Sequence, residues 1–484
     1  MESSLSWGLN RACYDKDTLV LTENGWKLHN AVKLQERIMV YDPVTNSMWY
    51  EVPGQLLAFE YDGQMVRFRS TLVDILVTPN HRMLYKSSSR NLDKLPWKIG
   101  LAKDLVGKRV NLPGTAYWEG GEDIEYVEVP EFWNKNGSIG PTLLHEVRIR
   151  IATWLRLAGY YLSEGGMDTT NRYLFTLSQA KRHKEVVDEI RSTLACLPFH
   201  SFEYLDEDEG SIRWNVYGKQ LCEFVVSCFG EGSTAKFISA KFKNLPPRHL
   251  KSLLQPMLKG DGTKKAERFI RLTTTSKQLA YDVAEIAAKI GLSTNIRTAY
   301  EAHGNRSTCY SVSFPLARYR GLQKSGITTP YYKGPVYCFS VSTGFYVTMR
   351  NGKIAFQGNT FIAAAKRGFK GGSGSGTGGK ESERSSKPKN AYFLGGGDEM
   401  AFKIEKGGVL LFTFGGKVQT EEEFDKRIRK RFGDKFPEAW NEALAYVKKF
   451  DKNTLLSAED FFRDVYRPVR DVWAEKWSAA SDQA

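Results

Sequence analysis

The segment LAGYYLSEGG (residues 157–166) has a counterpart in LLQPMLKGDG (residues 253–262). Each segment ends an apolar helical pattern with an acidic residue, Glu164 in the first and Asp261 in the second, directly before a glycine. In both regions the order is the helix that contains this segment, then a strand, then a second helix, and the two acidic residues are about 97 residues apart. The sequence therefore predicts one α/β module used twice.

Apolar periodicity gives the expected elements of each module. The first module is expected to contain a helix at 143–165, a strand at 172–179 and a helix at 183–197. The second is expected to contain a helix at 247–262, a strand at 268–276 and a helix at 278–292.

The paired acidic residues suggest a metal site. Small Ala158 and Gly159 would let two helices approach closely about a pseudo-dyad, which brings Glu164 and Asp261 to one point. Like charges there are costly unless a hard cation neutralises them, and Mg²⁺ suits carboxylate oxygens. The alternative is two carboxylates on a solvated face, and the repeat argues against it.

Both flanks of this α/β region are rich in strand and turn signals. Residues 13–115 alternate β-branched and polar residues between Asn-Gly and Asp-Pro turns, and residues 335–357 return to that pattern. We therefore expect an all-β unit split by an α/β insert. Residues 370–390 have the composition of a flexible basic linker, and a strand pair and helices are expected after it.

Bulk composition restricts the partner and the compartment. The 484 residues carry a net charge of +14, which favours a polyanionic partner such as nucleic acid, although charge alone can serve solubility. The six cysteines form no CxxC pair, as expected in a reducing cytoplasm. We expect no membrane partner and no export, because neither a membrane-length apolar run nor a leader-like start is present.

Cys13 lies at the upstream seam of the split β unit. A thiol can attack the preceding carbonyl and convert the Ala12–Cys13 amide into a thioester. The leaving nitrogen then needs a proton and the oxyanion needs donors, for which His81 and Thr78 of the segment TPNH are candidates. A buried structural cysteine and an ordinary histidine are the alternatives for isolated residues of these types.

Asn359 and Thr360 lie at the downstream seam, after the strand-like IAF at 354–356. The Asn359 side-chain amide can attack its own backbone carbonyl and cut the Asn359–Thr360 bond, while Thr360 offers a hydroxyl that can accept an acyl group. Alone, this pair would be a surface turn. Together with Cys13 it permits a relay of thioester formation, acyl transfer, Asn cyclisation and amide repair.

These motifs resemble those of an intein that carries a LAGLIDADG homing endonuclease. The intein-like blocks are CYDKDTLVLTENG (13–25), DILVTPNHRMLY (74–85) and GPVYCFSVSTGFYVTMRNGKIAFQGN (334–359). The endonuclease-like blocks are the two repeated segments, together with KFKNLPP (241–247) and TTTSKQLAYDVAEIAAKIGL (273–292).

The resemblance implies roles for particular residues. Cys13 would be the first nucleophile, Thr78 and His81 would activate the upstream bond, Asn359 would cyclise, and Thr360 would accept the acyl group. Glu164 and Asp261 would be catalytic metal ligands for Mg²⁺, whereas splicing would need no cofactor.

Three departures from the family pattern affect these expectations. Gly358 stands where histidine is usual, so we expect slow Asn cyclisation and faster release in Gly358→His if histidine fits. Cys338 stands where aspartate is common, and we favour a catalytic role in the downstream steps over the alternative of a buried thiol without one. Gln255-Pro256 replaces the small pair of the second helix, so its packing is expected to be irregular.

The insert is expected to bind double-stranded DNA at the uninterrupted host-gene site. The strands of each half would form a saddle-shaped sheet that lies in the major groove. Basic residues near these strands are candidate DNA contacts, with a solvated face as the alternative, and the sequence does not identify the catalytic lysine. The candidates are Lys241, Lys243, Lys264, Lys265, Arg268 and Arg271.

The expected fold is multidomain: a split all-β Hint horseshoe, an inserted α/β LAGLIDADG endonuclease with two αββαββ-like repeats, and a small α+β C-terminal host segment. The expected boundaries are 1–12 and 360–390 for flanking host sequence and linker, 13–120 and 331–359 for the Hint domain, 121–330 for the endonuclease, and 391–484 for the host segment.

The expected function is self-catalysed splicing combined with site-specific cleavage of DNA by a monomer, in the cytoplasm of a microbial or viral host cell. One alternative is a host binding or structural protein whose decayed insert folds but neither splices nor cuts. Another is cleavage without ligation, as in hedgehog-type domains, but that chemistry needs no downstream asparagine. The activity of the spliced host protein and the DNA target are not predictable from these residues.

Overall fold

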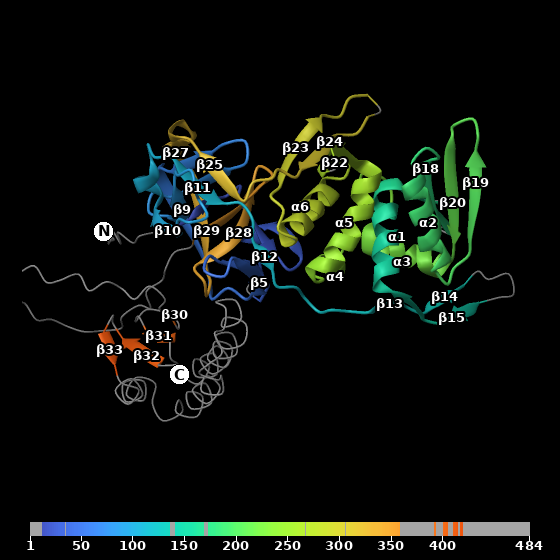
Figure 1. Cartoon of the computed structure of the whole chain (residues 1–484), viewed down its shortest axis with the longest axis horizontal. Helices are drawn as coiled ribbons and strands as arrows, with labels where there is room; N and C mark the ends of the chain where they lie inside the picture. The colour runs from blue at the N-terminus through green and yellow to red at the C-terminus, as the bar shows by residue number, and fades with distance from the viewer. Residues whose placement is uncertain are drawn as a thin grey trace, which may run out of the picture. The chain divides into compact units, whose positions relative to one another are not determined.

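The computed structural model describes residues 12–33, 35–135, 141–168, 173–266, 268–304 and 306–358, and four strands between residues 392 and 419 (Figure 1). The chain forms two compact units, Met1–Phe361 and Ile362–Ala484. Asn359, Thr360, the 370–390 linker and the helices expected after residue 419 lie outside the described residues.

The first unit contains a β-domain built from residues 12–118 and 319–358. Its strands are β1 (Tyr14–Asp15), β2 (Leu19–Thr22), β3 (Gly25–Leu28), β4 (Ile38–Asp42), β5 (Ser47–Glu51), β6 (Gln55–Gln64), β7 (Val66–Arg69), β8 (Asp74–Val77), β9 (Arg82–Ser87), β10 (Lys98–Leu101), β11 (Val110–Pro113), β12 (Tyr117–Trp118), β25 (Tyr319–Leu322), β26 (Ile327–Thr328), β27 (Tyr331–Ser340), β28 (Phe345–Arg350) and β29 (Lys353–Gly358). Three short 3₁₀ helices accompany them, η1 (His29–Ala31), η2 (Ala102–Leu105) and η3 (Lys324–Gly326).

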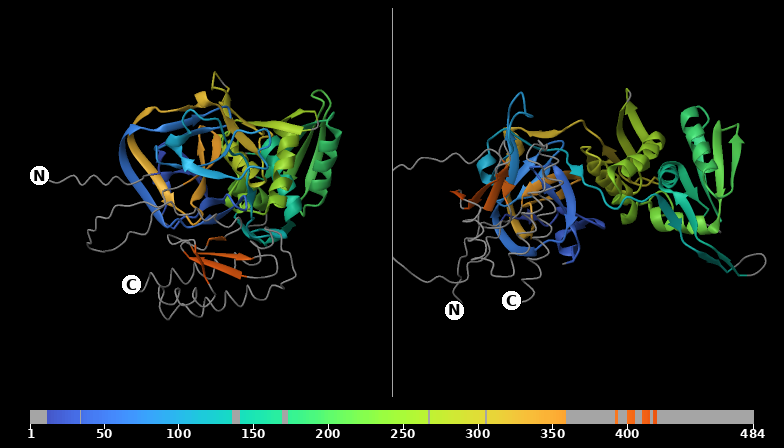
Figure 2. Two further views of the ribbon diagram at one scale, coloured as in Figure 1. Left: turned by 60° about the vertical axis from the view of Figure 1, so that its left-hand side comes forward. Right: turned by 60° about the horizontal axis from the view of Figure 1, so that its bottom comes forward.

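The two stretches of the β-domain share the same sheets. One sheet has the order β26-β7-β8-β1-β27-β6, and β27 pairs with β6 over its full length, from Tyr331 opposite Gln64 to Ser340 opposite Gln55. Figure 2 shows the early blue and late orange strands interleaved. A β-rich unit interrupted by an α/β insert is therefore observed, as predicted.

The α/β insert (residues 119–318) contains the repeated elements. Its helices are α1 (Ile151–Glu164), α2 (Lys184–Ala195), α3 (Lys219–Phe229), α4 (Ala240–Lys243), α5 (Pro247–Asp261) and α6 (Lys277–Lys289). Its strands are β13 (Tyr126–Val129), β14 (Phe132–Asn134), β15 (Thr142–Leu144), β16 (Val147–Arg150), β17 (Gly165–Met167), β18 (Leu174–Ala180), β19 (Ser201–Asp206), β20 (Ser211–Tyr217), β21 (Gly262–Lys265), β22 (Arg268–Thr274), β23 (Asn295–Tyr300) and β24 (Cys309–Ser313).

The two halves of the insert have the same topology. The sheet order is β17-β18-β20-β19 in the first half and β21-β22-β24-β23 in the second. In chain order each half is a helix, two strands, a helix and two strands, so the predicted αββαββ repeat is confirmed.

Helices α1 and α5 pack against each other through small residues. A Cβ atom on Gly159 would lie only 2.6 Å from the Leu253 carbonyl oxygen and 2.8 Å from the Pro256 Cβ. Pro256 lies inside α5 without ending it, and its ring fills the space beside Gly159. The close approach needs the missing side chain of glycine.

Two predicted boundaries are wrong. The helix expected at 143–165 begins at Ile151, because Val147–Arg150 (β16) pairs with β13 and Thr142–Leu144 (β15) pairs with β14. The β-domain resumes near residue 319 rather than 331, since β25 pairs with β11 and β26 pairs with β7.

The β-domain and the insert share one continuous sheet. Strand β23 pairs with β29 at Asn295 and Lys353, and the Ile296 N–H donates to the Gly352 carbonyl at 2.9 Å. Asn351 and Gly352 form the β28–β29 turn, both with positive φ, as this hairpin type requires. A Cβ on Gly352 would also collide with Ile296. The conformation of this turn therefore allows its backbone to pair with β23 of the insert.

A buried ion cluster supports the same junction. The Lys243 ammonium lies 2.7 Å from the Asp282 carboxylate and 3.0 Å from Glu285, and Lys289 lies 2.7 Å from Glu285. All four side chains are almost completely buried. Burial lowers the pKa of Lys289 to about 8, whereas Glu285 and Asp282 raise the pKa of Lys243 against the effect of burial.

This cluster reaches the β-domain through Lys289. Its ammonium lies 5.0 Å from the ring centre of Tyr50 and 5.1 Å from that of Trp118, in cation–π geometry. Lys289 also donates to the Asn244 side chain, which in turn donates to the Glu23 carbonyl at 3.0 Å. The insert is therefore joined to the β-domain by buried polar contacts as well as by the sheet.

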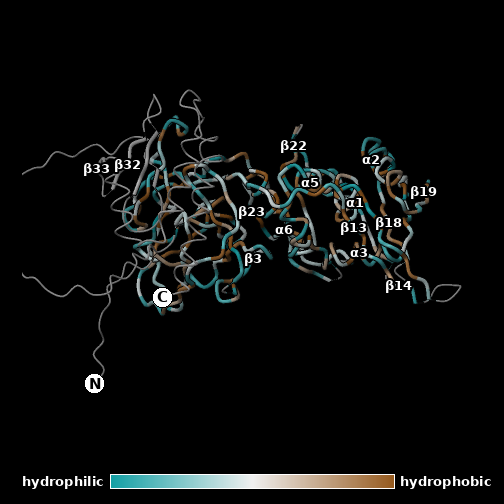
Figure 3. The backbone as a smooth tube through the Cα atoms, turned by 90° about the horizontal axis from the view of Figure 1, so that it is seen from below, coloured by the Kyte–Doolittle hydropathy of each residue, from teal (hydrophilic) through white to brown (hydrophobic). Residues whose placement is uncertain are grey.

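Hydropathy alternates along the elements of the first unit (Figure 3). Among the described residues, no helix combines the length and the apolar character needed to cross a membrane. In the second unit, β30 (Tyr392–Phe393), β31 (Met400–Ile404), β32 (Leu410–Phe414) and β33 (Lys417–Gln419) form an antiparallel sheet in that order.

Candidate catalytic sites

The first candidate site lies where α1 and α5 end. Glu164 and Asp261 are the last residues of these helices, and the next residues, Gly165 and Gly262, begin strands. A Cβ atom on Gly260 would lie 2.7 Å from the Glu164 carboxylate, so α5 passes directly beside Glu164. The helix packing therefore brings the two acidic positions together.

The two carboxylates influence each other electrostatically. Although Asp261 as a residue is exposed, its carboxyl group lies close to protein atoms, and this burial, followed by the charge of Glu164, raises its pKa to about 7. Burial also raises the pKa of Glu164, while a hydrogen bond from Gln179 and the charge of Lys236 oppose the change. Like charges held together in this way favour binding of a cation.

Lys236 is the buried basic residue beside this pair. Its ammonium donates to the carbonyls of Tyr161 at 2.8 Å, Leu162 at 3.1 Å and Gly165 at 2.8 Å, which cap the end of α1. Burial lowers its pKa to about 8, and the charges of Asp261 and Glu164 partly restore it. No spacing in the sequence distinguishes Lys236 from the other lysines, because its position depends on contacts with α1.

The donor set suits a hard divalent cation. Among the described residues, no group of three or more His, Cys, Asp or Glu side chains is placed to hold a metal. Mg²⁺, however, binds through one or two carboxylates together with water and phosphate oxygens. Glu164 and Asp261 fit that pattern.

The predicted DNA contacts fall into two groups. Lys243 is buried and paired with Asp282 and Glu285, so its expected contact with DNA is wrong. The partners that bury it come from α6, distant in sequence. The others are exposed: Lys241 lies on helix α4, and the strands β21 and β22 carry Lys264, Lys265, Arg268 and Arg271.

The second candidate site surrounds Cys13, just before β1. Thr78 contacts it twice: the Cys13 N–H donates to the Thr78 hydroxyl at 3.0 Å, and the Thr78 N–H donates to the Cys13 carbonyl at 3.0 Å. The Cys338 sulfur on β27 lies 3.5 Å from the Cys13 sulfur. All three side chains are buried, so residues from three distant segments meet at the Ala12–Cys13 bond.

His81 lies beside the same bond. The Thr78–His81 turn is closed by a hydrogen bond from the His81 N–H to the Thr78 carbonyl at 3.0 Å, with proline at its second position. Neither ring nitrogen has a partner at hydrogen-bonding distance among the described residues. Burial lowers the pKa of His81 to about 3, and the nearby Ala12 backbone only partly opposes this. The ring is therefore neutral near pH 7, with one nitrogen able to donate a hydrogen bond and the other able to accept one.

Tyr14 is a site residue that the sequence did not single out. Its hydroxyl donates to the Gly358 carbonyl at 2.5 Å, and its ring packs edge-on against His81 with centroids 4.6 Å apart. Burial raises its pKa well above the usual value, so the hydroxyl stays protonated as a donor. Tyr14 thus contacts both the histidine of the upstream seam and the last described residue of the downstream one.

Tyr14→Phe should slow the downstream cleavage selectively. Loss of the hydrogen bond to Gly358 removes about 0.5–1.5 kcal/mol of positioning energy, or roughly three- to tenfold in rate. Single-turnover kinetics of the two junctions, followed by mass spectrometry, will measure this. Equal slowing of thiol-induced cleavage at the upstream junction would contradict a selective role.

Gly358→His should not accelerate release, contrary to the expectation from the sequence. A Cβ at Gly358 would collide with the Arg82 carbonyl oxygen and lie 2.8 Å from the Arg82 Cβ. We expect destabilisation by about 1–3 kcal/mol, visible as a lower denaturant midpoint. Gly54→Ala is the matched control, because the nearest atom there, the Ser340 hydroxyl, is 3.8 Å away. Faster release with unchanged stability would contradict this.

Comparison with protein families gives a match in the second half of the insert. Residues 250–321 match the model described as a LAGLIDADG-like domain. The matched segment lies within α5 to β25 and leaves the rest of the chain unmatched by that model.

Two curated relatives share longer stretches of the chain. An ATP-dependent Clp protease proteolytic subunit of Chlamydomonas moewusii is 26% identical over 302 residues, covering 59% of this chain and 28% of the relative. A DNA-directed RNA polymerase subunit beta C-terminal section of Stigeoclonium helveticum is 22% identical over 408 residues, covering 72% and 36%. The chain thus spans about a third of these relatives.

Solved structures with similarity include the homing endonuclease I-DmoI in complex with DNA and Mn, at 13% identity and a TM-score of 0.26, covering 34% of this chain and 90% of that one. A splice-inactive AceL NrdHF class 3 split intein has 17% identity and a TM-score of 0.17, covering 43% and 98%. TM-scores this low do not establish a shared fold.

Proposed function

We propose that the chain is a self-splicing element that carries a site-specific, metal-dependent DNA endonuclease. The single observation that carries the nuclease is the pair of acidic helix ends, Glu164 and Asp261, brought together by two halves of identical topology. The match of residues 250–321 to a LAGLIDADG-like domain supports it.

Different residues of the insert would bind the metal ion, fix the end of α1 and contact the DNA phosphates. Glu164 and Asp261 would hold Mg²⁺, which when bound polarises the scissile phosphate and activates water. Lys236 fixes the end of α1 through three hydrogen bonds from its ammonium, and its positive charge would partly offset those of Glu164 and Asp261. Exposed lysines and arginines on the strands would neutralise phosphates and position the duplex.

The curated relatives are consistent with a mobile insert. Their names describe a protease subunit and an RNA polymerase subunit, two proteins without a common activity. Similarity of one chain to both is expected if the shared part is an element inserted into different hosts. The host activity of this chain does not follow from either name.

DNA cleavage can be tested on the uninterrupted host-gene junction. A duplex that spans this junction should be cut in both strands when Mg²⁺ is present and left intact with EDTA. A protein that binds the duplex but never cuts it would be a decayed nuclease. A protein that neither binds nor cuts the duplex would contradict the proposal that this chain acts on DNA.

Protein splicing is the second activity, favoured by the buried cluster at Cys13. The Cys13 sulfur would attack the Ala12 carbonyl carbon, so that a C–S bond forms, the C–N bond breaks and the nitrogen takes a proton. The Cys13 thiol supplies that proton. The neutral His81 ring, next to the Ala12 backbone, would relay it by accepting at one nitrogen and releasing from the other, while Thr78 would fix the amide. Transfer to Thr360 and cyclisation of Asn359 complete the relay proposed from the sequence.

The intact mass of the protein tests splicing directly. In a reducing buffer the chain should yield residues 13–359 as one product and a ligated product of residues 1–12 and 360–484. A chain that remains full length would favour a host protein with a decayed insert. Cleaved but unligated fragments would instead indicate hedgehog-like cleavage.

A further inference from the structure

The face of the sheet that carries Arg271 continues from the insert into the β-domain. Cross-strand neighbours form a row: Arg271 is opposite Ser313, Ser313 is opposite Asn295, and Asn295 is opposite Lys353. Residues directly opposite each other in antiparallel strands project to the same face. The row therefore runs from β22 through β24 and β23 to β29 without interruption.

This face points away from the helices of the insert. The next row, Leu272, Val312 and Ile296, is buried in the core with residues of α5 and α6. Because alternate residues of a strand face opposite sides, the row with Arg271 and Lys353 lies on the other side. Arg297, two residues after Asn295, shares this face and is exposed.

Basic residues gather where the row crosses into the β-domain. Burial lowers the pKa of Lys353, and the charges of Arg69 and Arg297 lower it further, while Asp74 opposes them. Lys353 is held in place by a hydrogen bond from its ammonium to the Ser70 carbonyl at 2.9 Å. Arg69, at the end of β7, is exposed like Arg297. We name Arg69, Arg297 and Lys353 the seam patch.

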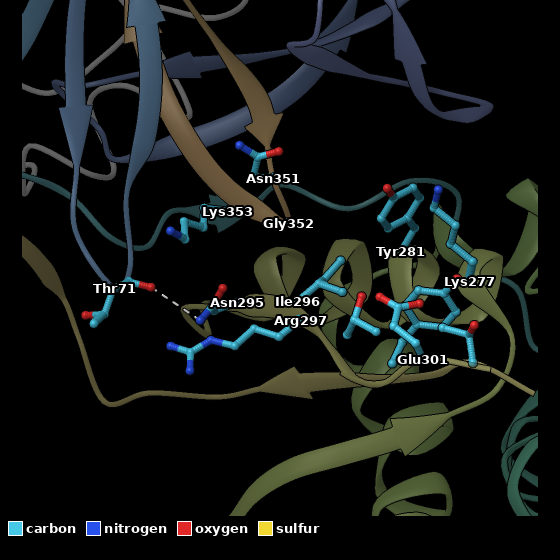
Figure 4. Close-up of a pocket in the computed structure, with 13 residues that line it drawn as sticks. Thr71, Lys277, Tyr281, Asn295, Ile296, Arg297, Glu301, Asn351, Gly352 and Lys353 are labelled. Atoms are coloured by element: carbon cyan, nitrogen blue, oxygen red, sulfur yellow. Dashed lines mark hydrogen bonds between the residues drawn. The ribbon is translucent and has the colours of Figure 1, made fainter. Parts of the chain in front are cut away.

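A groove marks the same junction. It has a volume of about 610 Å³ and is lined from the β-domain by Thr71, Asn351 and Lys353 and from the insert by residues including Asn295 and Arg297. In Figure 4, Lys353 and Arg297 extend on the same side as Thr71, whose carbonyl accepts a hydrogen bond from Asn295 at 3.3 Å. Tyr281, Lys277 and Glu301 lie on the opposite side.

We propose that the seam patch of the β-domain and β23 binds the phosphate backbone of the duplex flanking the cleavage site. The β-domain would then be part of the DNA-binding surface, in addition to its own chemistry. This inference rests on the proposed endonuclease function.

The distance from β22 to β29 is long enough for the seam patch to contact duplex that flanks the cleavage site. Three strand spacings separate β22 from β29, about 14 Å in all. At 3.4 Å per base pair this is about four base pairs of duplex beyond the position contacted at Arg271. The sheet shared across the junction carries Arg271, Arg297 and Lys353 on one face. Arg69 comes from β7 of the neighbouring sheet, near enough for its charge to act on Lys353. Phosphate contacts from such residues add affinity without sequence choice.

The test compares the full chain with Arg69→Gln/Arg297→Gln on the duplex that spans the uninterrupted junction, in EDTA so that no cutting occurs. Binding is measured by fluorescence anisotropy over a series of salt concentrations. The slope of log K against log[salt] should decrease in magnitude by about two, one for each phosphate contact. Lys353 is left unchanged because its ammonium also supports the Ser70 turn.

Two further duplexes locate the contact. Each is shortened by about six base pairs at one end. On the duplex that lacks the end contacted by the seam patch, the double variant should bind as tightly as the unmodified chain. On the duplex shortened at the other end, the double variant should still bind more weakly than the unmodified chain. Arg90→Gln/Lys98→Gln, two exposed basic residues of the β9–β10 segment that do not line the groove, should match the unmodified chain on all duplexes.

The outcomes separate this inference from the function on which it rests. Equal salt slopes for the double variant and the unmodified chain would overturn the seam contact, while binding and cutting by the unmodified chain would leave the nuclease in place. A loss that is equal on both shortened duplexes would also overturn it. An unmodified chain that neither binds nor cuts would remove the nuclease itself.

Discussion

Replacing Asp261 with asparagine is expected to reduce DNA cleavage by roughly 10³-fold or more, since charge stabilisation worth several kcal/mol is lost when a metal ligand is removed. Binding of the junction duplex should persist, because the exposed basic residues hold the DNA independently of this carboxylate. Glu164→Gln should behave in the same way. Cleavage and anisotropy assays on the same duplex measure both effects.

Asp188→Asn is the control for this prediction. Asp188 is an exposed carboxylate of α2 paired with Arg191, so its loss should leave cutting unchanged. Retained cutting in Asp261→Asn would mean that the cation is held elsewhere. Tighter metal-free binding in that variant would agree with the role assigned here, since removal of a negative charge beside the phosphates reduces repulsion.

Replacing Cys13 with alanine is expected to abolish thioester formation and ligation, a loss of several orders of magnitude, because no other group can perform the first attack. The measurement is cleavage at the Ala12–Cys13 bond by an added thiol or hydroxylamine. Cleavage at Asn359 can continue in this variant, since it uses its own side chain.

Two other cysteines test the specificity of that result. Cys196→Ala should splice normally, because Cys196 is exposed on the insert. Cys338→Ala should form the thioester but pass the acyl group on more slowly, if the 3.5 Å contact with Cys13 serves the later steps. Normal ligation by Cys338→Ala would show that Cys338 is a packing residue only.

The repeated module was predictable from the sequence for a simple physical reason. Helical periodicity ends at an acid–glycine pair in both halves, and the small residues before Glu164 are required by the close approach of α1 to α5. The start of α1 was not predictable, since apolar and basic residues alternate in Val147–Arg150, and this short pattern only becomes a strand through pairing with β13.

Site residues defined by long-range contacts were missed. Lys236 becomes distinctive only when its ammonium meets the carbonyls at the end of α1, and Tyr14 only when its hydroxyl meets Gly358. Lys243 was misassigned for the converse reason, because a lysine in a basic segment is usually exposed until buried acids accept it. None of these contacts leaves a local pattern.

The buried ion cluster at the junction has an evolutionary consequence. If the whole insert were deleted, Tyr50 and Trp118 would lose the Lys289 that covers them, and the Glu23 carbonyl would lose its donor. A lineage that no longer needs DNA cleavage can more easily lose the acidic pair by point substitution than shed the insert. Descendants that have lost the proposed DNA cleavage should therefore retain a folded insert, with constant junction residues and substitutions at Glu164 and Asp261.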